Sequence, residues 1–267
     1  MKKYLITLLL GTLFSSNIAF AEHSTYEIKG TASHIRYSET VNNAFFMRDK
    51  GYMLGIEGAW RYTGNDWLWL AIEASFSSGK VDYQSNGTGS MKGNADLLAD
   101  TRILMGYQMK GWTPYSGFGY RYLQDDSRNK VSTTGATGYL RRANYFYIPL
   151  GVTAPLEYYI SGIQLFDGWH INAFVEYDLF VYGLQKSYVG ATGPLNNDQY
   201  NGWGARASVQ FVKEFESLYK LVLEPYVKHW HIDDSFPNCT VGGGFSICGL
   251  EPDNKSTEFG VKIGIVI

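Results

Sequence analysis

Apolar and polar residues alternate along most of the chain, and the segment 167–184, DGWHINAFVEYDLFVYGL, shows this most clearly. Every second position from Trp169 to Val181 is apolar, whereas Glu176 and Asp178 belong to the intervening set. Successive side chains of a strand point to opposite faces, so a strand here would have one apolar and one charged face. A helix would move both carboxylates into the apolar set, because 3.6 residues per turn does not preserve the alternation. The pattern predicts a strand.

The same alternation recurs along the chain and predicts ten strands in all. These strands cover approximately 25–37, 51–62, 67–76, 96–107, 115–122, 144–152, 167–184, 200–211, 219–230 and 257–267. Each is close to the length that a tilted strand needs to cross a bilayer, about 9–11 residues. The long connections at 38–50, 80–95, 123–140, 184–200 and 232–256 alternate with shorter ones at 63–66, 109–111, 155–167 and 214–217. An even number of strands with this loop asymmetry predicts an all-β, up-and-down antiparallel transmembrane barrel with short periplasmic turns and long extracellular loops.

The first residues have the pattern of a secretory signal peptide. Lys2 and Lys3 precede an apolar run from Tyr4 to Phe14, and the sequence Ala-Phe-Ala at 19–21 provides a cleavage site. The apolar run is too short for a transmembrane helix. We therefore assign 1–21 to a signal peptide and 22–267 to a single barrel domain.

Composition supports amphipathic strands and excludes several functions. The chain has 21 Tyr, 15 Phe, 7 Trp and 30 Gly, a mixture that favours strands and turns. Without the two lysines of the signal, 21 of the 23 basic residues remain against 25 acidic ones, so a nucleic-acid partner is not expected. No mature segment has 18 consecutive apolar residues, which excludes helical membrane spans. We find no nucleotide-binding or nucleophile-elbow motif and expect no cofactor.

In these features the chain resembles the small bacterial outer-membrane β-barrel proteins, a class that includes porin-like, opacity-type and omptin-type barrels. The resemblance covers nearly all of 22–267 and includes the alternation of Phe259, Val261, Ile263 and Ile265 in the last strand. Ile267 stands where this class usually ends in an aromatic residue. The resemblance implies location in the outer membrane of a Gram-negative cell, after export through the periplasm.

Charged residues of the strands fall on the face opposite to the apolar one. The acidic members are Glu27, Glu57, Glu73, Asp100, Glu176, Asp178 and Glu224, and the basic members are Lys29, Arg61, Arg102, Arg121, Arg206, Lys228 and Lys262. A lysine or arginine facing lipid at mid-depth costs about 2–4 kcal/mol, so these residues should face the lumen. Seven acids and seven bases predict an ion-pair network that fills a narrow barrel, rather than a selective pore. A catalytic role for the Glu176–Asp178 pair is the weaker alternative.

A second group of candidates lies where strands meet outer loops. In HWHIDDS, 229–235, His229 and His231 share a face and Asp233 follows two residues later, a spacing that could bind a metal. The segment could instead supply a hydrolytic His/Asp pair from His231 and Asp233, with Asp125 and Asp126 as opposing acids. Omptin-type proteases place acids and a histidine at this rim, although the omptin motifs do not match here residue by residue. The competing interpretation is a polar rim, with no metal bound and Trp230 in an interfacial aromatic belt.

Cys239 and Cys248 are the only cysteines and fall in one predicted outer loop, CTVGGGFSIC. The periplasm is oxidising, so we expect a disulfide within this loop.

Three functions remain open on the sequence. We favour a monomeric, non-enzymatic barrel that contacts outer-membrane lipid and displays its loops to a host or envelope partner. The alternatives are a small-solute porin and a rim protease or lipid hydrolase built on Asp125, Asp126, His231 and Asp233. A fold alone does not select among them.

Overall fold

The computed structural model describes most of the chain beyond the predicted signal peptide. The described residues are 24–64, 67–156, 168–190, 193–215 and 219–267. The predicted signal peptide, 1–21, and most of the predicted connection 155–167 lie outside them. No helix among these residues is long and apolar enough to cross a membrane.

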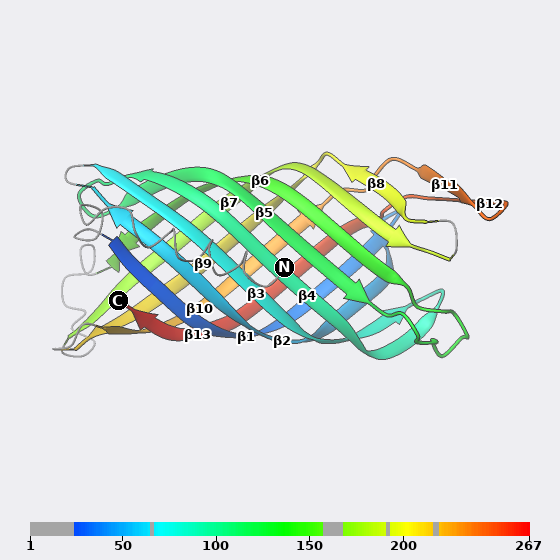
Figure 1. The fold of residues 1–267 in the computed structure, drawn as a ribbon, viewed down its shortest axis with the longest axis horizontal. Helices are drawn as coiled ribbons and strands as arrows, with labels where there is room; N and C mark the ends of the chain where they lie inside the picture. The colour runs from blue at the N-terminus through cyan, green and yellow to red at the C-terminus, as the bar shows by residue number, and fades with distance from the viewer. Residues whose placement is uncertain (1–23, 65–66, 157–167, 191–192, 216–218) are drawn as a thin grey trace, which may run out of the picture.

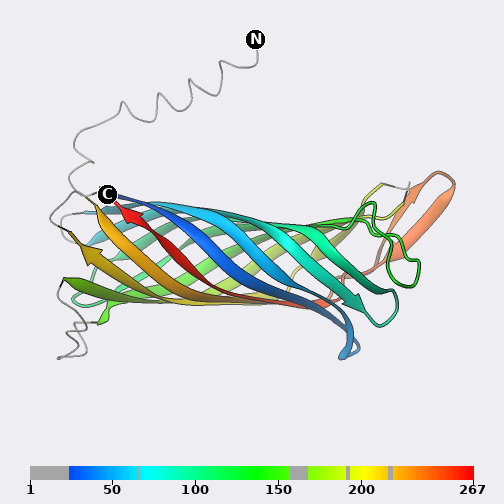
Figure 2. The same cartoon turned by 90° about the horizontal axis from the view of Figure 1, so that it is seen from below.

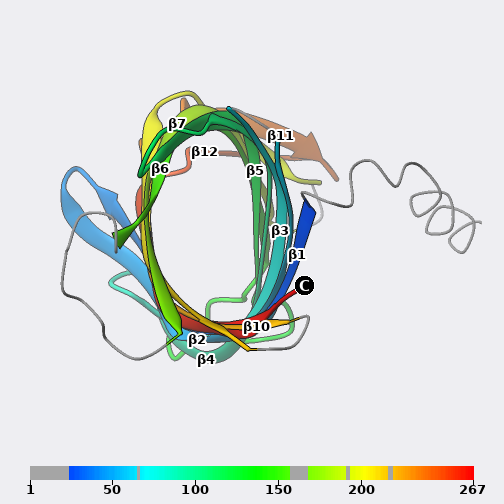
Figure 3. The same ribbon diagram turned by 90° about the vertical axis from the view of Figure 1, so that its left-hand side faces the viewer.

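Ten antiparallel strands form a closed barrel (Figure 3). They are β1 (Ser24–Val41), β2 (Ala44–Thr63), β3 (Leu68–Ser85), β4 (Gly89–Tyr107), β5 (Thr113–Asp126), β6 (Leu140–Pro155), β7 (Trp169–Tyr188), β9 (Gly202–Glu214), β10 (Lys220–Ile232) and β13 (Asp253–Val266). Each pairs with the next around the ring, and β13 pairs with β1 to close it. The predicted fold class is thus confirmed. Closure satisfies the backbone of every barrel strand by pairing on both sides, the requirement for spanning lipid with strands.

The two faces of the wall follow the predicted alternation. Val175 is 57% exposed on the outside, whereas the neighbouring Glu176 and Asp178 are buried inside. Along the closing seam, Ile28 pairs with Ile265 on the outer face, and the adjacent Lys29 points inward. The exposed apolar side chains therefore form a belt around the barrel that suits a lipid solvent.

The outer ends of the strands differ from the prediction. The segment 38–50, predicted as a loop, is almost entirely strand, because β1 and β2 continue to a tight turn at Asn42 and Asn43 with positive φ at both residues. Beyond the lipid belt the pattern inverts: Ile35 is buried inside, while Arg36 is exposed outside. The prediction of a long loop here is wrong. It recognised a strand only where one face was apolar, and a strand beyond the lipid does not need an apolar outer face.

Three short strands extend the outer end. β8 (Leu195–Gln199) pairs with the outer part of β7, and β11 (Asn238–Gly242) pairs with β12 (Phe245–Gly249) as a separate hairpin. The hairpin projects beyond the barrel, at the end opposite to the start of β1 and the end of β13 (Figures 1 and 2).

Candidate functional site: the lumen and the outer rim

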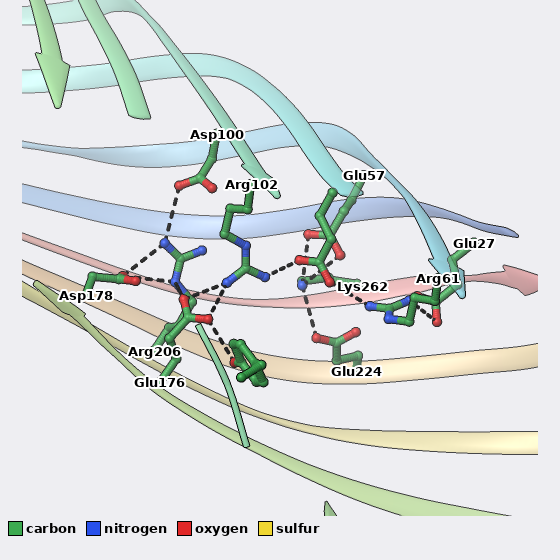
Figure 4. Close-up of polar contacts among 12 residues, drawn as sticks. Glu27, Glu57, Arg61, Asp100, Arg102, Glu176, Asp178, Arg206, Glu224 and Lys262 are labelled. Carbon is green, nitrogen blue, oxygen red and sulfur yellow. Dashed lines mark hydrogen bonds and ion pairs between the residues drawn. The ribbon is translucent and has the colours of Figure 1, made fainter. Parts of the chain in front are cut away.

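Two lysines and two glutamates join four strands in the inner half of the lumen, where Figure 4 shows Lys262 between Glu57 and Glu224. The Lys29 ammonium lies 2.8 Å from a Glu224 oxygen and 2.9 Å from Glu57, and the Lys262 ammonium lies 3.0 and 2.9 Å from the same two residues. All four are buried. Arg61 pairs with Glu27 and Glu73 and extends the network toward the periplasmic end.

Arg102 and Arg206 bind the carboxylates of Glu176 and Asp178 on β7. Glu176 accepts from Arg102 at 2.6 Å and from Arg206 Nε at 2.8 Å, and Asp178 accepts from Arg206 at 3.0 Å (Figure 4). Arg206 also reaches Asp100, on the far side of the lumen, at 3.4 Å. Each carboxylate thus has a guanidinium partner, which offsets the cost of removing both charges from water.

The remaining two predicted lumen bases lie against aromatic rings. Arg121 stacks over Trp230 with its guanidinium carbon 5.3 Å from the ring centre, and the Lys228 ammonium lies 5.3 Å from the centre of Tyr226. Trp230 is 1% exposed and points into the barrel, so the prediction of an interfacial position is wrong. Trp230 lies two residues after Lys228 on the same strand and therefore faces inward as Lys228 does. The sequence already contained this alternation.

A cluster of aromatic side chains from β6, β7 and β10, called here the aromatic layer, lies inside the barrel. Tyr145, Tyr147, Phe180 and Trp230 pack together, each at most 6% exposed. Just beside this layer, Arg121 on β5 donates to Ser256 on β13, strands on opposite sides of the ring, at 3.3 Å. On the inner side of the layer lies a cavity of about 240 Å³, lined by charged members of the network and by Tyr115 and Phe174.

The outer half of the lumen has an excess of acid. Arg141 on β6 pairs with Glu39 on β1, directly across the ring, and with Glu251 at 2.5 Å. Asp49 and Asp125 line a small cavity beside it, and each has a buried oxygen with no hydrogen-bond partner in the part of the chain that the structure describes. Burial, reinforced by neighbouring acids, raises the pKa of Asp125 to about 6 and the pKa of Glu251 to about 7.

This outer group was not predicted from the sequence; it comprises Tyr37, Glu39, Asp49, Asp96, Arg141 and Glu251. Three of these residues, Glu39, Asp49 and Glu251, lie in segments predicted as loops. Continuing the alternation past the lipid belt would have placed them on the inner face.

The four rim candidates do not gather in one place. Asp125 faces the lumen, and Asp126 pairs with Arg128 at 2.6 Å. His231 faces outward, beside the ring of Trp203, and Asp233 lies near it, with 3.7 Å between His231 Nε2 and the carboxylate. The unpredicted partner is Asp253, the first residue of β13, whose oxygen lies 2.5 Å from His231 Nε2.

The predicted disulfide joins Cys239 and Cys248, which face each other across the β11–β12 hairpin. The base of the hairpin is fixed to β8: the Asn197 amide donates to the Phe236 and Gly249 carbonyls, and the Asn238 amide donates to the carbonyl of residue 196. The hairpin is therefore fixed at its base, by these hydrogen bonds and by the disulfide one residue pair further along.

Comparison with known proteins identifies the fold but no close relative. No protein-family model and no curated protein matches the chain. Among solved structures, the outer membrane protease OmpT from Escherichia coli has a TM-score of 0.61 at 8% identity, covering 94% of this chain and 98% of that one. The translocator domain of the autotransporter NalP from Neisseria meningitidis has a TM-score of 0.40 at 9% identity, covering 97% and 92%. OprG from Pseudomonas aeruginosa has a TM-score of 0.34 at 14% identity, covering 91% and 95%.

Proposed function

We propose that this chain, whose fold is that of the outer-membrane β-barrels, is a monomeric, non-conducting barrel that displays its outer rim and the β11–β12 hairpin to a partner at the cell surface. The observation that carries the proposal is that side chains from opposite walls contact each other across the lumen at three levels. These contacts occur at the level of Arg206 and Asp100, at Arg121 and Ser256, and at Arg141 and Glu39.

These contacts across the lumen favour an anchor over the small-solute porin. An ion passing through would have to separate buried pairs such as Arg102–Glu176, and breaking a buried pair costs about 3–5 kcal/mol. It would then meet the aromatic layer of Tyr145, Tyr147, Phe180 and Trp230. The cavity of about 240 Å³ on the inner side of this layer is large enough to hold water.

The outer wall supports placement in the outer membrane with the hairpin outside. Arg36, Lys50, Lys80 and Lys255 are exposed on neighbouring strands just beyond the apolar belt. Arg36 and Lys50 are directly opposite each other across β1 and β2. Cations at this level suit the anionic groups of lipids in the surrounding leaflet.

The hairpin region supplies the surface for a partner. Phe236, two residues before β11, is 78% exposed, and Val241 on β11 is 75% exposed. The segment 238–249 carries no charged residue. Exposed apolar side chains on a fixed hairpin are typical of a protein-binding surface, so the partner we propose is a host or envelope protein with an apolar patch.

Conductance tests the anchor function. Refolded mature protein in a planar bilayer should give no defined current steps, with a heat-shifted gel band as proof of folding. Stable open steps from folded protein would overturn the proposal in favour of the porin.

Crosslinking in whole cells tests the display function. A photo-activated residue at Val241 should form one specific protein adduct, whereas the same residue at Lys92, exposed on β4, should not. Equal adducts from both positions, or none from Val241 in the native host, would contradict a hairpin-specific partner.

A further inference from the structure

We infer that His231, Asp233 and Asp253 form a binding site for a divalent transition cation of the Zn²⁺ type, at the base of the segment that carries the hairpin. One ligand atom from each residue lies within 4.8 Å of the others. His231 Nε2 is 2.5 Å from Asp253 Oδ2 and 3.7 Å from Asp233 Oδ1.

These spacings need little change to receive a metal. Zn²⁺ holds nitrogen and oxygen ligands at about 2.0–2.2 Å, so tetrahedral ligand atoms lie roughly 3.4 Å apart. The two separations measured from His231 Nε2 lie on either side of this value. Small side-chain rotations of His231 and Asp233 would bring the three donors into place, and a water molecule would complete the site.

The surroundings of Asp253 suit a ligand role. Its second oxygen, Oδ1, accepts a hydrogen bond from the Thr40 hydroxyl at 3.0 Å, which fixes the carboxylate with Oδ2 toward His231. Partners of this kind commonly orient carboxylate ligands in metal sites. The Asp233 carboxylate is about half exposed, and its one ion-pair contact among the described residues is the distant His231, so the carboxylate can turn toward an ion.

The donor set determines the class of ion. One imidazole and two carboxylates suit Zn²⁺ and its neighbours, whereas Ca²⁺ and Mg²⁺ prefer oxygen ligands alone. Two carboxylates against one imidazole give the site a net negative charge. Lys255, the ladder partner of His231, adds one exposed positive charge nearby, and Asp234 adds a negative one.

The position of the site suggests what the ion does. Asp233 directly follows β10, and Asp253 begins β13, so an ion bound to both would join the two ends of segment 234–252. That segment contains the disulfide-linked hairpin. This role deepens the proposed display function and rests on it, whereas metal binding itself can be measured without any partner.

The test is a Zn²⁺ titration of refolded, tag-free protein, previously treated with chelator, followed by calorimetry. Wild type should bind one Zn²⁺ per chain, and an equal concentration of Ca²⁺ should not compete. His231→Ala, Asp233→Asn and Asp253→Asn should each weaken binding at least tenfold. The matched control is His229→Ala, because His229 also faces outward but bonds to Thr257, outside the triad.

A second readout examines the segment itself. Zn²⁺ should slow proteolysis within 234–252 in wild type and in His229→Ala, but not in His231→Ala. Absence of saturable Zn²⁺ binding, or equal loss in the two histidine variants, would overturn the site. Binding without slower proteolysis would overturn the clamping role. His231 and Asp253 lie on strands, and their variants could fail to fold. Asp233 lies outside the strands, so Asp233→Asn still tests the site in that case. If hairpin crosslinking fails, only the proposed display function is contradicted, because Zn²⁺ binding and proteolysis are measured without a partner.

Discussion

Replacing Arg206 with Met tests whether the lumen network stabilises the barrel. The guanidinium contacts Glu176, Asp178 and Asp100, and it donates to the Tyr147 hydroxyl at 2.9 Å. Methionine fills part of the space but leaves Asp178, which is 0% exposed, without a basic partner. Removing one member of a buried ion pair typically costs about 3–5 kcal/mol. Glu176 keeps Arg102, so we expect the loss in unfolding free energy to lie near the lower end, at about 3 kcal/mol.

Urea unfolding of refolded protein in detergent, followed by tryptophan fluorescence and by the heat-shifted gel band, measures this loss. Arg36→Met is the matched control, because Arg36 is exposed on the outer wall and should change stability by less than about 0.5 kcal/mol. Adding Asp178→Asn to Arg206→Met should recover part of the lost stability, since it removes the charge left without a partner. A loss below about 1 kcal/mol for Arg206→Met, or no recovery in the double variant, would refute the reasoning.

Three further predictions test the two faces of the wall, the outer lumen and the hairpin. Val175→Arg places a charge in the lipid belt and should lower stability in vesicles by about 2–4 kcal/mol, whereas Thr31→Arg, on the lumen face, should impair folding yield less; equal yields would mean that the faces are misassigned. Burial raises the pKa of Asp125 to about 6, so the folded state binds its proton more tightly than the unfolded state, and stability should fall as pH rises from about 4 to 6. Asp125→Asn removes this effect and should therefore stabilise the protein by about 1–3 kcal/mol at pH 7.5 but little at pH 4, as urea titrations at both values would show. Asp126→Asn is its control and should give no gain at pH 7.5, because Asp126 already pairs with Arg128. The double variant Cys239→Ser/Cys248→Ser should be cut faster by protease within 238–249, while the urea midpoint of the barrel stays unchanged, because the hairpin is a separate sheet; a lower midpoint would show that the hairpin supports the barrel.

The fold could be predicted from the sequence because lipid and lumen impose opposite demands on successive residues. Val175 and Glu176 are adjacent in the chain yet face different surroundings, and this contrast repeats in every barrel strand. The outer ends could not be placed in this way. Above the lipid both faces tolerate polar residues, as Arg36 and Glu39 show, so the apolar signal ends before the strand does.

The sets of charges could be predicted, but their partners could not. Arg102 binds Glu73 on the adjacent strand and also Glu176, three strands away around the ring, a choice that depends on barrel diameter and stagger. Likewise, Asp253 reaches His231 only because of the register between β10 and β13. No local sequence pattern encodes the Arg102–Glu176 pairing or the His231–Asp253 contact.

The lumen network also has a consequence for how the barrel folds. Lys29 lies on the first strand, whereas its partner Glu224 is 195 residues later, and Lys262 on the last strand pairs with Glu57 on the second. These contacts form only when β13 meets β1, so an open sheet would hold several buried charges without partners. Contacts so distant in sequence slow folding. They also make closure cooperative: a sheet closed in the wrong register would leave like charges together, and the correct register is the one in which they are neutralised. The ion pairs therefore select the correct closure as well as filling the lumen.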